Sequence, residues 1–162
     1  ALVSLQKINK DFSIEQPIFN FELQWDGENY KKKYELKPKK DDDDKPDCVT
    51  KIIELSNVNK LVSSLINGQI YVWDLSAKKI DFSINAHKSA IWSMIKLSND
   101  NIVSGSSDKM IKIWDILSGM SEPTIKLRGH KATVFCLGEI QKNKLLSGSE
   151  DRTIKLWDLE QK

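Results

Sequence analysis

Pairs of Trp and Asp recur along this chain at positions 73–74, 114–115 and 157–158, which are 41 and 43 residues apart. The segments that end in the second and third pairs are SGSSDKMIKIWD (104–115) and SGSEDRTIKLWD (147–158), identical at eight of twelve positions. The segment SSLINGQIYVWD (63–74) keeps Ser, Ile, Trp and Asp in the same register. A period of this length predicts a repeat architecture, in which each unit is one supersecondary structure that cannot bury its hydrophobic face alone.

Hydrophobic residues alternate with polar ones inside each repeat. In the second unit the runs AIWSMIKL, NIVSGS, MIKIWD and PTIKL are separated by the turn-forming segments SND and SDK and by a polar turn. This period of two predicts four short strands that form an antiparallel meander. Some of these runs are apolar on both faces, so the sheets are expected to stack on one another around an axis.

The repeat resembles the WD-repeat β-propeller family, whose signature is Gly-His followed about 27 residues later by Trp-Asp. His87 and His130 each precede a Trp by 27 residues, and the resemblance covers residues 46–162. It implies an all-β propeller of three four-stranded antiparallel blades, at 46–85, 86–128 and 129–162. Known propellers use about four to eight blades, and the third unit ends just after its third strand. We therefore expect a partial ring with a truncated third blade, in a piece of a longer protein whose remaining blades come from the same chain or a partner.

The resemblance also implies that four polar side chains form a hydrogen-bonded tetrad inside each blade. By position the complete tetrads are His87, Ser104, Asp108 and Trp114, and then His130, Ser147, Asp151 and Trp157. The first unit keeps only Ser63 and Trp73, because Asn67 replaces the Asp and Lys45-Pro46 stands where Gly-His is expected. This blade is therefore predicted to be the least stable of the three.

A Ser, His and Asp set could instead indicate a nucleophilic catalytic site. The same triplet recurs in each complete repeat, however, and the family places it inside the blade rather than in one cleft. The structural role is therefore the prediction, and the chain is expected not to be an enzyme.

No metal or cofactor site is predicted. The order Cys48, His87, His130 and Cys136, with gaps of 39, 43 and 6 residues, matches no compact zinc pattern. Cys136 is expected to be a small buried thiol in a strand. The glycines within 104–106 and 147–149 lack the spacing of a phosphate-binding loop and are expected to mark close approach between blades.

Two aromatic residues, Trp92 and Phe135, follow the first apolar residue of a strand in successive repeats. In the family this position faces the narrow rim of the central channel, where partners dock. The predicted partner-binding rim consists of Trp92, Phe135, Ser107, Glu150, Ala90 and Thr133. The alternative is that both rings pack between blades as ordinary core.

The N-terminal part is less regular. Residues 1–30 form a segment of uncertain structure, in which FNFELQW (19–25) alternates like a half-buried strand that could complete another blade as an outer strand. Residues 31–45 carry seven Lys and five acidic residues and are expected to form a charged linker or loop. The DDDDK run at 41–45 also matches a protease site used in expression vectors, so its origin is either natural or engineered.

The net charge of +2 supplies no long-range field that would attract nucleic acid or an anionic membrane. Two distant cysteines suit a reducing compartment, so an intracellular location is expected, in the cytoplasm or alternatively in a cytoskeletal, ciliary or nuclear assembly. The predicted function is a non-catalytic scaffold that binds other proteins or peptides within a multiprotein complex. The alternatives are a targeting or substrate-recognition propeller of a larger enzyme, such as a ubiquitin ligase, and a subunit of an RNA-containing particle. Nucleic acid is not expected as a direct partner, although the Lys-rich stretch 31–40 leaves that possibility open.

Overall fold

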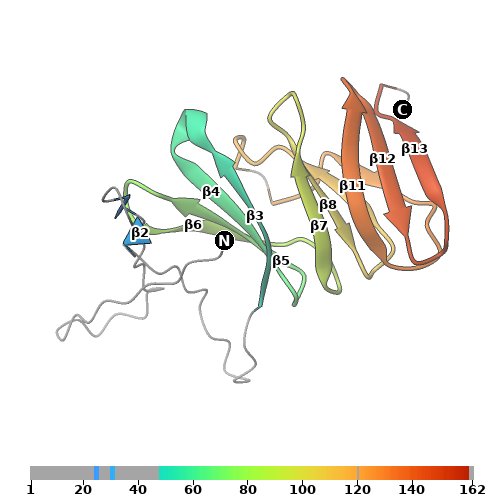
Figure 1. Ribbon diagram of the computed structural model, residues 1–162, viewed down its shortest axis with the longest axis horizontal. Coiled ribbons are helices and arrows are strands. Elements are labelled where there is room, and N and C mark those ends of the chain that lie inside the picture. The colour runs from blue at the N-terminus through green and yellow to red at the C-terminus, as the bar shows by residue number, and fades with distance from the viewer. Residues whose placement is uncertain (1–23, 26–29, 32–47, 120, 161–162) are drawn as a thin grey trace.

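Three antiparallel sheets follow one another along the chain in the computed structural model, which describes residues 24–25, 30–31, 48–119 and 121–160 (Figure 1). The first sheet contains β3 (Val49–Leu55), β4 (Lys60–Leu65), β5 (Gln69–Asp74) and β6 (Lys79–Asn85), with the short 3-10 helix η1 (Ser56–Val58) between β3 and β4. The second contains β7 (Ile91–Lys96), β8 (Ile102–Ser106), β9 (Ile111–Trp114) and β10 (Ile125–Leu127). The third contains β11 (Val134–Gln141), β12 (Lys144–Ser149) and β13 (Ile154–Asp158).

Strands pair with their sequence neighbours in every sheet, which is the meander predicted from the alternating pattern. Two sheets have four strands, and the third has three in the described residues. The expected all-β fold with a truncated third unit is therefore confirmed. The first strands of the sheets, β3, β7 and β11, lie beside one another, and the sheets fan out from them in chain order (Figure 1).

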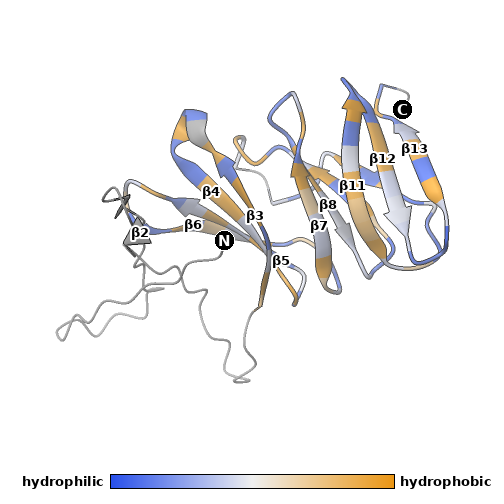
Figure 2. Ribbon diagram, in the orientation of Figure 1, coloured by the Kyte–Doolittle hydropathy of each residue, from blue (hydrophilic) through white to orange (hydrophobic). Residues whose placement is uncertain are grey.

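Hydrophobic side chains fill the two spaces between neighbouring sheets. Between the first and second sheets, Ile70 and Val72 of β5 belong to the same cluster as Ile91 of β7. Between the second and third sheets, Ile113 of β9 packs in one cluster with Val134 of β11. Figure 2 shows hydrophobic residues along strands of all three sheets, so each interface is built from apolar positions of both partners.

The outer face of the third sheet is open. Ile154 and Leu156 of β13 are 78% and 61% exposed. The side chains at the equivalent positions of the first two sheets are at most 1% exposed, and they are Ile70, Val72, Ile111 and Ile113. The same sequence pattern is therefore buried wherever a following sheet covers it. At the other end of the arc, Val49 is exposed while its counterparts Ile91 and Val134 are fully buried.

Gly105 marks a close approach between sheets, as predicted. A Cβ atom at this position would lie 2.8 Å from Cγ1 of Val134 in the third sheet. For Gly148 the prediction is not tested, because no described sheet covers that face of the third sheet; a Cβ there would meet Sγ of Cys136 on the neighbouring strand of its own sheet. Cys136 itself is exposed rather than buried, since it lies on the third sheet, whose outer face no described sheet covers.

A polar contact also links the second and third sheets, at the end of the sheets away from the rim. The backbone N–H and the hydroxyl of Ser98 donate to the two carboxylate oxygens of Glu139, each at 2.8 Å. Ser98 follows β7 and Glu139 lies on β11, so this contact ties the first strands of neighbouring sheets together.

The N-terminal segment is described at four residues only. Strand β1 (Gln24–Trp25) pairs with β2 (Tyr30–Lys31) in a separate two-stranded sheet. Gln24 and Trp25 therefore do not supply an outer strand to a propeller sheet, while residues 19–23 of that predicted strand lie outside the described residues. The predicted linker at 31–45 also lies outside them, except for Lys31. In the part of the chain that is described, no helix is long and apolar enough to cross a membrane.

Substitution of Gly105 by Ala tests how closely the second and third sheets pack. The added methyl group would collide with Val134, so we expect a lower melting temperature. The double variant G105A/V134A should recover part of the loss, because removing Cγ1 of Val134 makes room. Gly138→Ala is the matched control, since no atom lies within 4 Å of a Cβ at that position. Equal melting temperatures for G105A and G138A would contradict the packing described here.

Candidate functional site: buried tetrads and an aromatic rim

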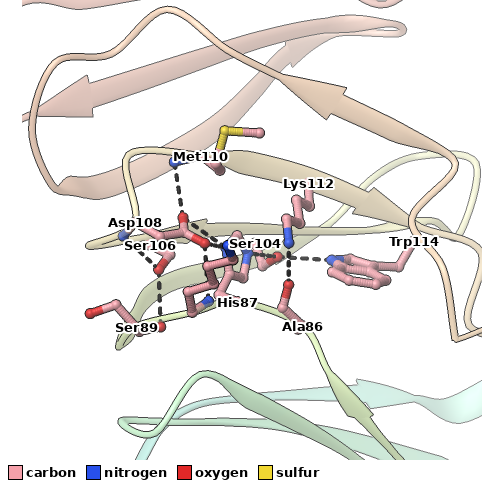
Figure 3. A network of polar contacts seen from close by, with 10 residues as sticks. Ala86, His87, Ser89, Ser104, Ser106, Asp108, Met110, Lys112 and Trp114 are labelled. Carbon is pink, nitrogen blue, oxygen red and sulfur yellow. Dashed lines mark hydrogen bonds and ion pairs between the residues drawn. The ribbon is translucent and has the colours of Figure 1, made fainter.

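The second sheet contains a continuous chain of hydrogen bonds through four side chains (Figure 3). The Trp114 indole N–H donates to Oγ of Ser104 at 2.8 Å, and Oγ of Ser104 lies 2.8 Å from Nε2 of His87. On the other side of the imidazole ring, Nδ1 of His87 lies 2.9 Å from a carboxylate oxygen of Asp108. The structure thus brings together all four residues of the tetrad expected in this repeat.

A neutral imidazole satisfies every member of this chain. Nδ1–H of His87 donates to Asp108, while Nε2 accepts from the Ser104 hydroxyl, whose oxygen accepts from Trp114. Burial lowers the pKa of His87 below its ordinary value, more than the hydrogen bond and charge of Asp108 raise it. The ring is therefore uncharged at neutral pH.

Asp108 holds its charge at the edge of the sheet. Burial by itself raises the pKa of this carboxyl, but hydrogen bonds from His87 and from the backbone N–H groups of Met110 and Lys88 outweigh it and lower the pKa to about 2. Those amides donate at 3.0 and 3.2 Å. The carboxylate therefore ties the loop before β7 to the turn between β8 and β9.

The third sheet repeats the arrangement. Nε2 of His130 lies 2.7 Å from Oγ of Ser147, which accepts from the Trp157 indole N–H at 2.8 Å. Nδ1 of His130 lies 2.7 Å from Asp151, and the backbone N–H of Lys131 donates to the same carboxylate at 2.8 Å. Hydrogen bonds from Thr153 and Lys131 help to lower the pKa of Asp151.

The first sheet keeps one link of the chain. The Trp73 indole N–H donates to Oγ of Ser63 at 2.7 Å. Asn67, at the position of the Asp, accepts from the backbone N–H of Gln69 at 3.0 Å and so holds its own turn. Lys45 and Pro46 lie outside the described residues.

The Ser, His and Asp geometry resembles that of a serine hydrolase, but Ser104 and Ser147 are 0% and 1% exposed. Each hydroxyl oxygen also accepts from an indole N–H. A nucleophile needs an open site beside it where the reacting carbonyl can lie. These buried serines offer none, so the tetrads hold the sheets together.

Trp92 and Phe135 lie at β-bulges, which the sequence pattern did not reveal. The pairing of β7 with β8 shifts between Ile91 and Ser93, and that of β11 with β12 shifts between Val134 and Cys136. A bulge leaves one residue unpaired and turns its side chain away from the regular alternation. Ile91 and Ser93 are buried on either side of Trp92, which is 39% exposed, and Phe135 is 50% exposed.

The two rings meet across the boundary between the second and third sheets. Their centroids are 6.1 Å apart and their planes are inclined by 63°, an edge-to-face contact. The Trp92 indole N–H donates to Oγ of Ser107 at 2.8 Å, which fixes the ring over the β8–β9 turn. Neither ring belongs to the clusters between the sheets, so the alternative of ordinary core does not hold.

The other predicted rim residues frame this pair. The backbone N–H of Ser107 donates to the carbonyl of Ala90, and that of Glu150 donates to the carbonyl of Thr133, both at 2.9 Å. These bonds close the end of each sheet next to an aromatic ring. The structure therefore gathers the six predicted rim residues at one end of the second and third sheets.

Four basic residues at the same end were missed. Lys88 and Lys131 follow the tetrad His residues, and Lys109 and Arg152 follow the tetrad Asp residues, all with exposed side chains. Their repetition at fixed offsets was visible in the aligned repeats, as HK twice and as DK and DR. What the sequence could not give was that they lie at the same end of the sheets as the exposed aromatic rings.

Metal binding finds no support among the described residues, which contain no group of three or more His, Cys, Asp or Glu side chains arranged to hold an ion. Cys48 and Cys136 are both exposed thiols without a disulfide.

The comparison with known proteins agrees with this geometry. The family model described as WD domain, G-beta repeat matches residues 78–115 and 121–158. The chain belongs to the WD-repeat family. Its structure is also similar to that titled "Structure of U3-55K", with a TM-score of 0.63 and 22% identity over 70% of this chain and 37% of that one. This similarity confirms the expected β-propeller fold, as an open partial ring.

Curated relatives match this chain over short stretches. Protein SPA1-related 3 of Arabidopsis thaliana is 32% identical over 72 residues, which is 43% of this chain and 8% of that protein. The ribosome biogenesis protein YTM1 of Vanderwaltozyma polyspora is 29% identical over 62 residues, which is 38% of this chain and 14% of that protein. This chain thus spans a small part of the length of these relatives.

Each matched WD repeat is offset from the sheets. The repeat at 78–115 runs from β6 to β9, and the repeat at 121–158 runs from β10 to β13. The first strand of each repeat therefore completes the preceding sheet, and the other three begin the next one. This sharing explains why the third sheet has three strands among the described residues.

The tetrads make a matched comparison of two serines possible. Ser104→Ala removes two hydrogen bonds, one to the imidazole of His87 and one from the indole N–H of Trp114. Ser63→Ala removes one, from the indole N–H of Trp73. Since a buried polar group without a partner costs about 1–3 kcal/mol, we expect the larger loss of unfolding free energy for S104A. Urea denaturation followed by tryptophan fluorescence measures both losses. An equal or larger loss for S63A would contradict the stabilising role of the full tetrad.

The lowered pKa of His87 predicts a pH dependence of stability. His in the unfolded chain takes up a proton near pH 6.5, whereas His87 in the folded chain resists it. As the pH falls below that value, the unfolded state binds more protons and stability decreases. The melting temperature should therefore be lower at pH 5.5 than at pH 7.5, with a smaller difference in the variant His87→Asn. A wild-type melting temperature that rises on acidification would be the opposite outcome.

Proposed function

We propose that this chain is a non-catalytic scaffold that binds other proteins through the rim of its propeller. The observation that carries the proposal is the exposed aromatic pair Trp92 and Phe135, held in place at the edge of two rigid sheets. Large aromatic side chains on a pre-ordered surface bind with little loss of conformational entropy. Such a pair is therefore suited to anchor a partner.

The rigidity of the rim comes from the tetrads beneath it. Asp108 and Asp151 each accept hydrogen bonds from the loop before the first strand and from the turn after the second. Trp92 and Phe135 follow that loop at the start of β7 and β11, and the Trp92 indole N–H donates to Ser107 in the turn. A partner would thus meet a surface that is already ordered.

The absence of catalysis in this proposal rests on the burial of the tetrad serines. Their hydroxyl groups are within hydrogen-bond distance of imidazole nitrogens, but no substrate can approach them without opening the sheet. Two exposed cysteines that form no disulfide suit a reducing compartment and support an intracellular, cytoplasmic location.

The matched relatives do not select one assembly. A SPA1-related protein and a ribosome biogenesis protein share the repeat, and a fold used in such different settings does not define a pathway. What supports the proposal is the match to the WD-repeat model, since WD repeats generally serve as binding modules.

Truncation of the rim aromatics tests the proposal. Trp92→Ala and Phe135→Ala should leave the melting curve nearly unchanged, because both rings lie outside the core clusters. Both should reduce the amount of partner captured by the immobilised chain from an extract, as quantified by mass spectrometry. Trp114→Ala is the control for a buried ring. It should reduce the free energy of unfolding by about 3–5 kcal/mol and therefore lower the melting temperature strongly. Partner capture that is unaffected by W92A and F135A would overturn the rim as the binding site.

A further inference from the structure

The rim is bordered by exposed basic side chains. In the second and third sheets it is formed by the loops 86–90 and 128–133 and the turns 106–110 and 149–153. The exposed charged residues in these segments are Lys88, Lys109, Arg128, Lys131, Arg152 and Glu150. All of them except Glu150 are basic. None of Lys88, Lys109, Lys131 and Arg152 forms an ion pair with a described residue.

The acidic residues of the rim loops are largely shielded. The side chains of Asp108 and Asp151 are 10% and 7% exposed, and their oxygens accept hydrogen bonds from the tetrad His and from backbone amides. A ligand at the rim therefore meets ammonium and guanidinium groups rather than these carboxylates.

The opposite ends of the same sheets are different. At those ends Lys96 forms an ion pair with Asp100, and Lys144 forms one with Asp158. Nζ of Lys126 lies 3.4 Å from Oε2 of Glu122. These three positive charges are neutralised within the chain, whereas the exposed Lys142 at that end forms no ion pair with a described residue. The basic groups at the rim lack such internal partners, so they are available to a ligand.

The backbone at two of the basic positions favours glycine. Lys109 and Arg152 have φ angles of 70° and 65°, in the left-handed region, and the equivalent residue of the first sheet is Gly68 with φ of 90°. Residues other than glycine are uncommon in this backbone conformation. A basic residue therefore occupies this turn twice where glycine would be less strained.

We infer that the rim binds an acidic peptide segment, with an apolar side chain packed against Trp92 and Phe135 and carboxylates that reach Lys88, Lys109, Lys131 and Arg152. The inference rests on the proposed protein-binding function and names the chemical class of the partner. Opposite charges around an apolar anchor supply both orientation and a faster association. The backbone N–H of Glu150 donates to the carbonyl of Thr133, two residues before Phe135, so the acidic residues of the ligand are expected to flank its apolar anchor.

A peptide is favoured over a nucleic acid because the basic groups do not form an uninterrupted track. The exposed carboxylate of Glu150 lies at the same rim, and the whole chain has a net charge of only +2. A phosphate backbone would need continuous positive charge along its path.

Selection from a random peptide library displayed on phage tests the class of ligand without a known partner. We expect the peptides retained by the wild-type chain to be enriched in Asp and Glu around one large apolar residue, and W92A to lose them. Retention of basic peptides that depend on Trp92 would overturn the acidic class while leaving the protein-binding function intact. Peptides that bind W92A and F135A as well as wild type, or a selection without enrichment, would overturn the proposed site.

One selected acidic peptide, labelled with a fluorophore, then serves as the probe in anisotropy titrations. The variant K109G/R152G should weaken binding about two- to tenfold, and its fold should be retained because glycine suits both φ angles. Glu150→Lys should tighten binding, whereas Glu122→Lys, with the same change in net charge at the opposite end, should leave it unchanged. Weaker binding by E150K would overturn the inference.

Labelled polyuridine RNA is the remaining probe. Weak binding of this RNA relative to the selected peptide, at the same salt concentration, is the expected result. Tighter binding of the RNA that falls steeply with added salt would assign the rim to nucleic acid and overturn both proposals.

Discussion

Burial of both faces of each sheet is the constraint on which the rest of this structure depends. Strand β9 places Ile111 and Ile113 toward the third sheet, and β7 places Ile91 toward the first, so the second sheet cannot be stable on its own. Each large aliphatic side chain that becomes fully buried contributes about 1.5–3 kcal/mol. Stacking of equivalent sheets is the arrangement that recovers this stabilisation for every repeat. The exposed Ile154 and Leu156 mark where the stacking stops among the described residues.

The same stacking buries several polar side chains, which therefore need hydrogen-bond partners inside the sheets. A buried imidazole, hydroxyl or indole N–H is costly alone, but a chain of hydrogen bonds satisfies all of them. The neutral state of His87 is part of this solution, because its two nitrogens then serve as one donor and one acceptor. The charged member of the tetrad is Asp108, whose carboxylate also accepts hydrogen bonds from the backbone N–H groups of Lys88 and Met110. The hydrogen bonds of the tetrads therefore satisfy the buried polar groups and also link the loop, the turn and the strands.

The bulges connect this framework to the surface. At the same position of β7 and β11, an extra residue turns outward between the buried start of the strand and the regular alternation that follows. In the first sheet the pairing shifts at the equivalent place, and Thr50 stands there with its hydroxyl 2.9 Å from Oγ of Ser64. The second and third sheets thus turn an aromatic side chain outward at this position, whereas Thr50 of the first sheet bonds to the buried Ser64. Two adjacent sheets carry aromatic rings, and these rings meet.

The sequence by itself determined the repeats, the strands and the members of the tetrads, because these depend on local periodicity and on spacing that every copy preserves. His87 and Trp114 could be paired from the sequence since a second copy, His130 and Trp157, stands at the same separation. The sequence did not reveal the bulges, the exposure of Cys136, or the contact between Trp92 and Phe135. Exposure depends on whether another sheet covers a position, and contacts between sheets depend on how the sheets stack. Only the tertiary structure decides these, because residues from different repeats meet in space without any fixed separation along the chain.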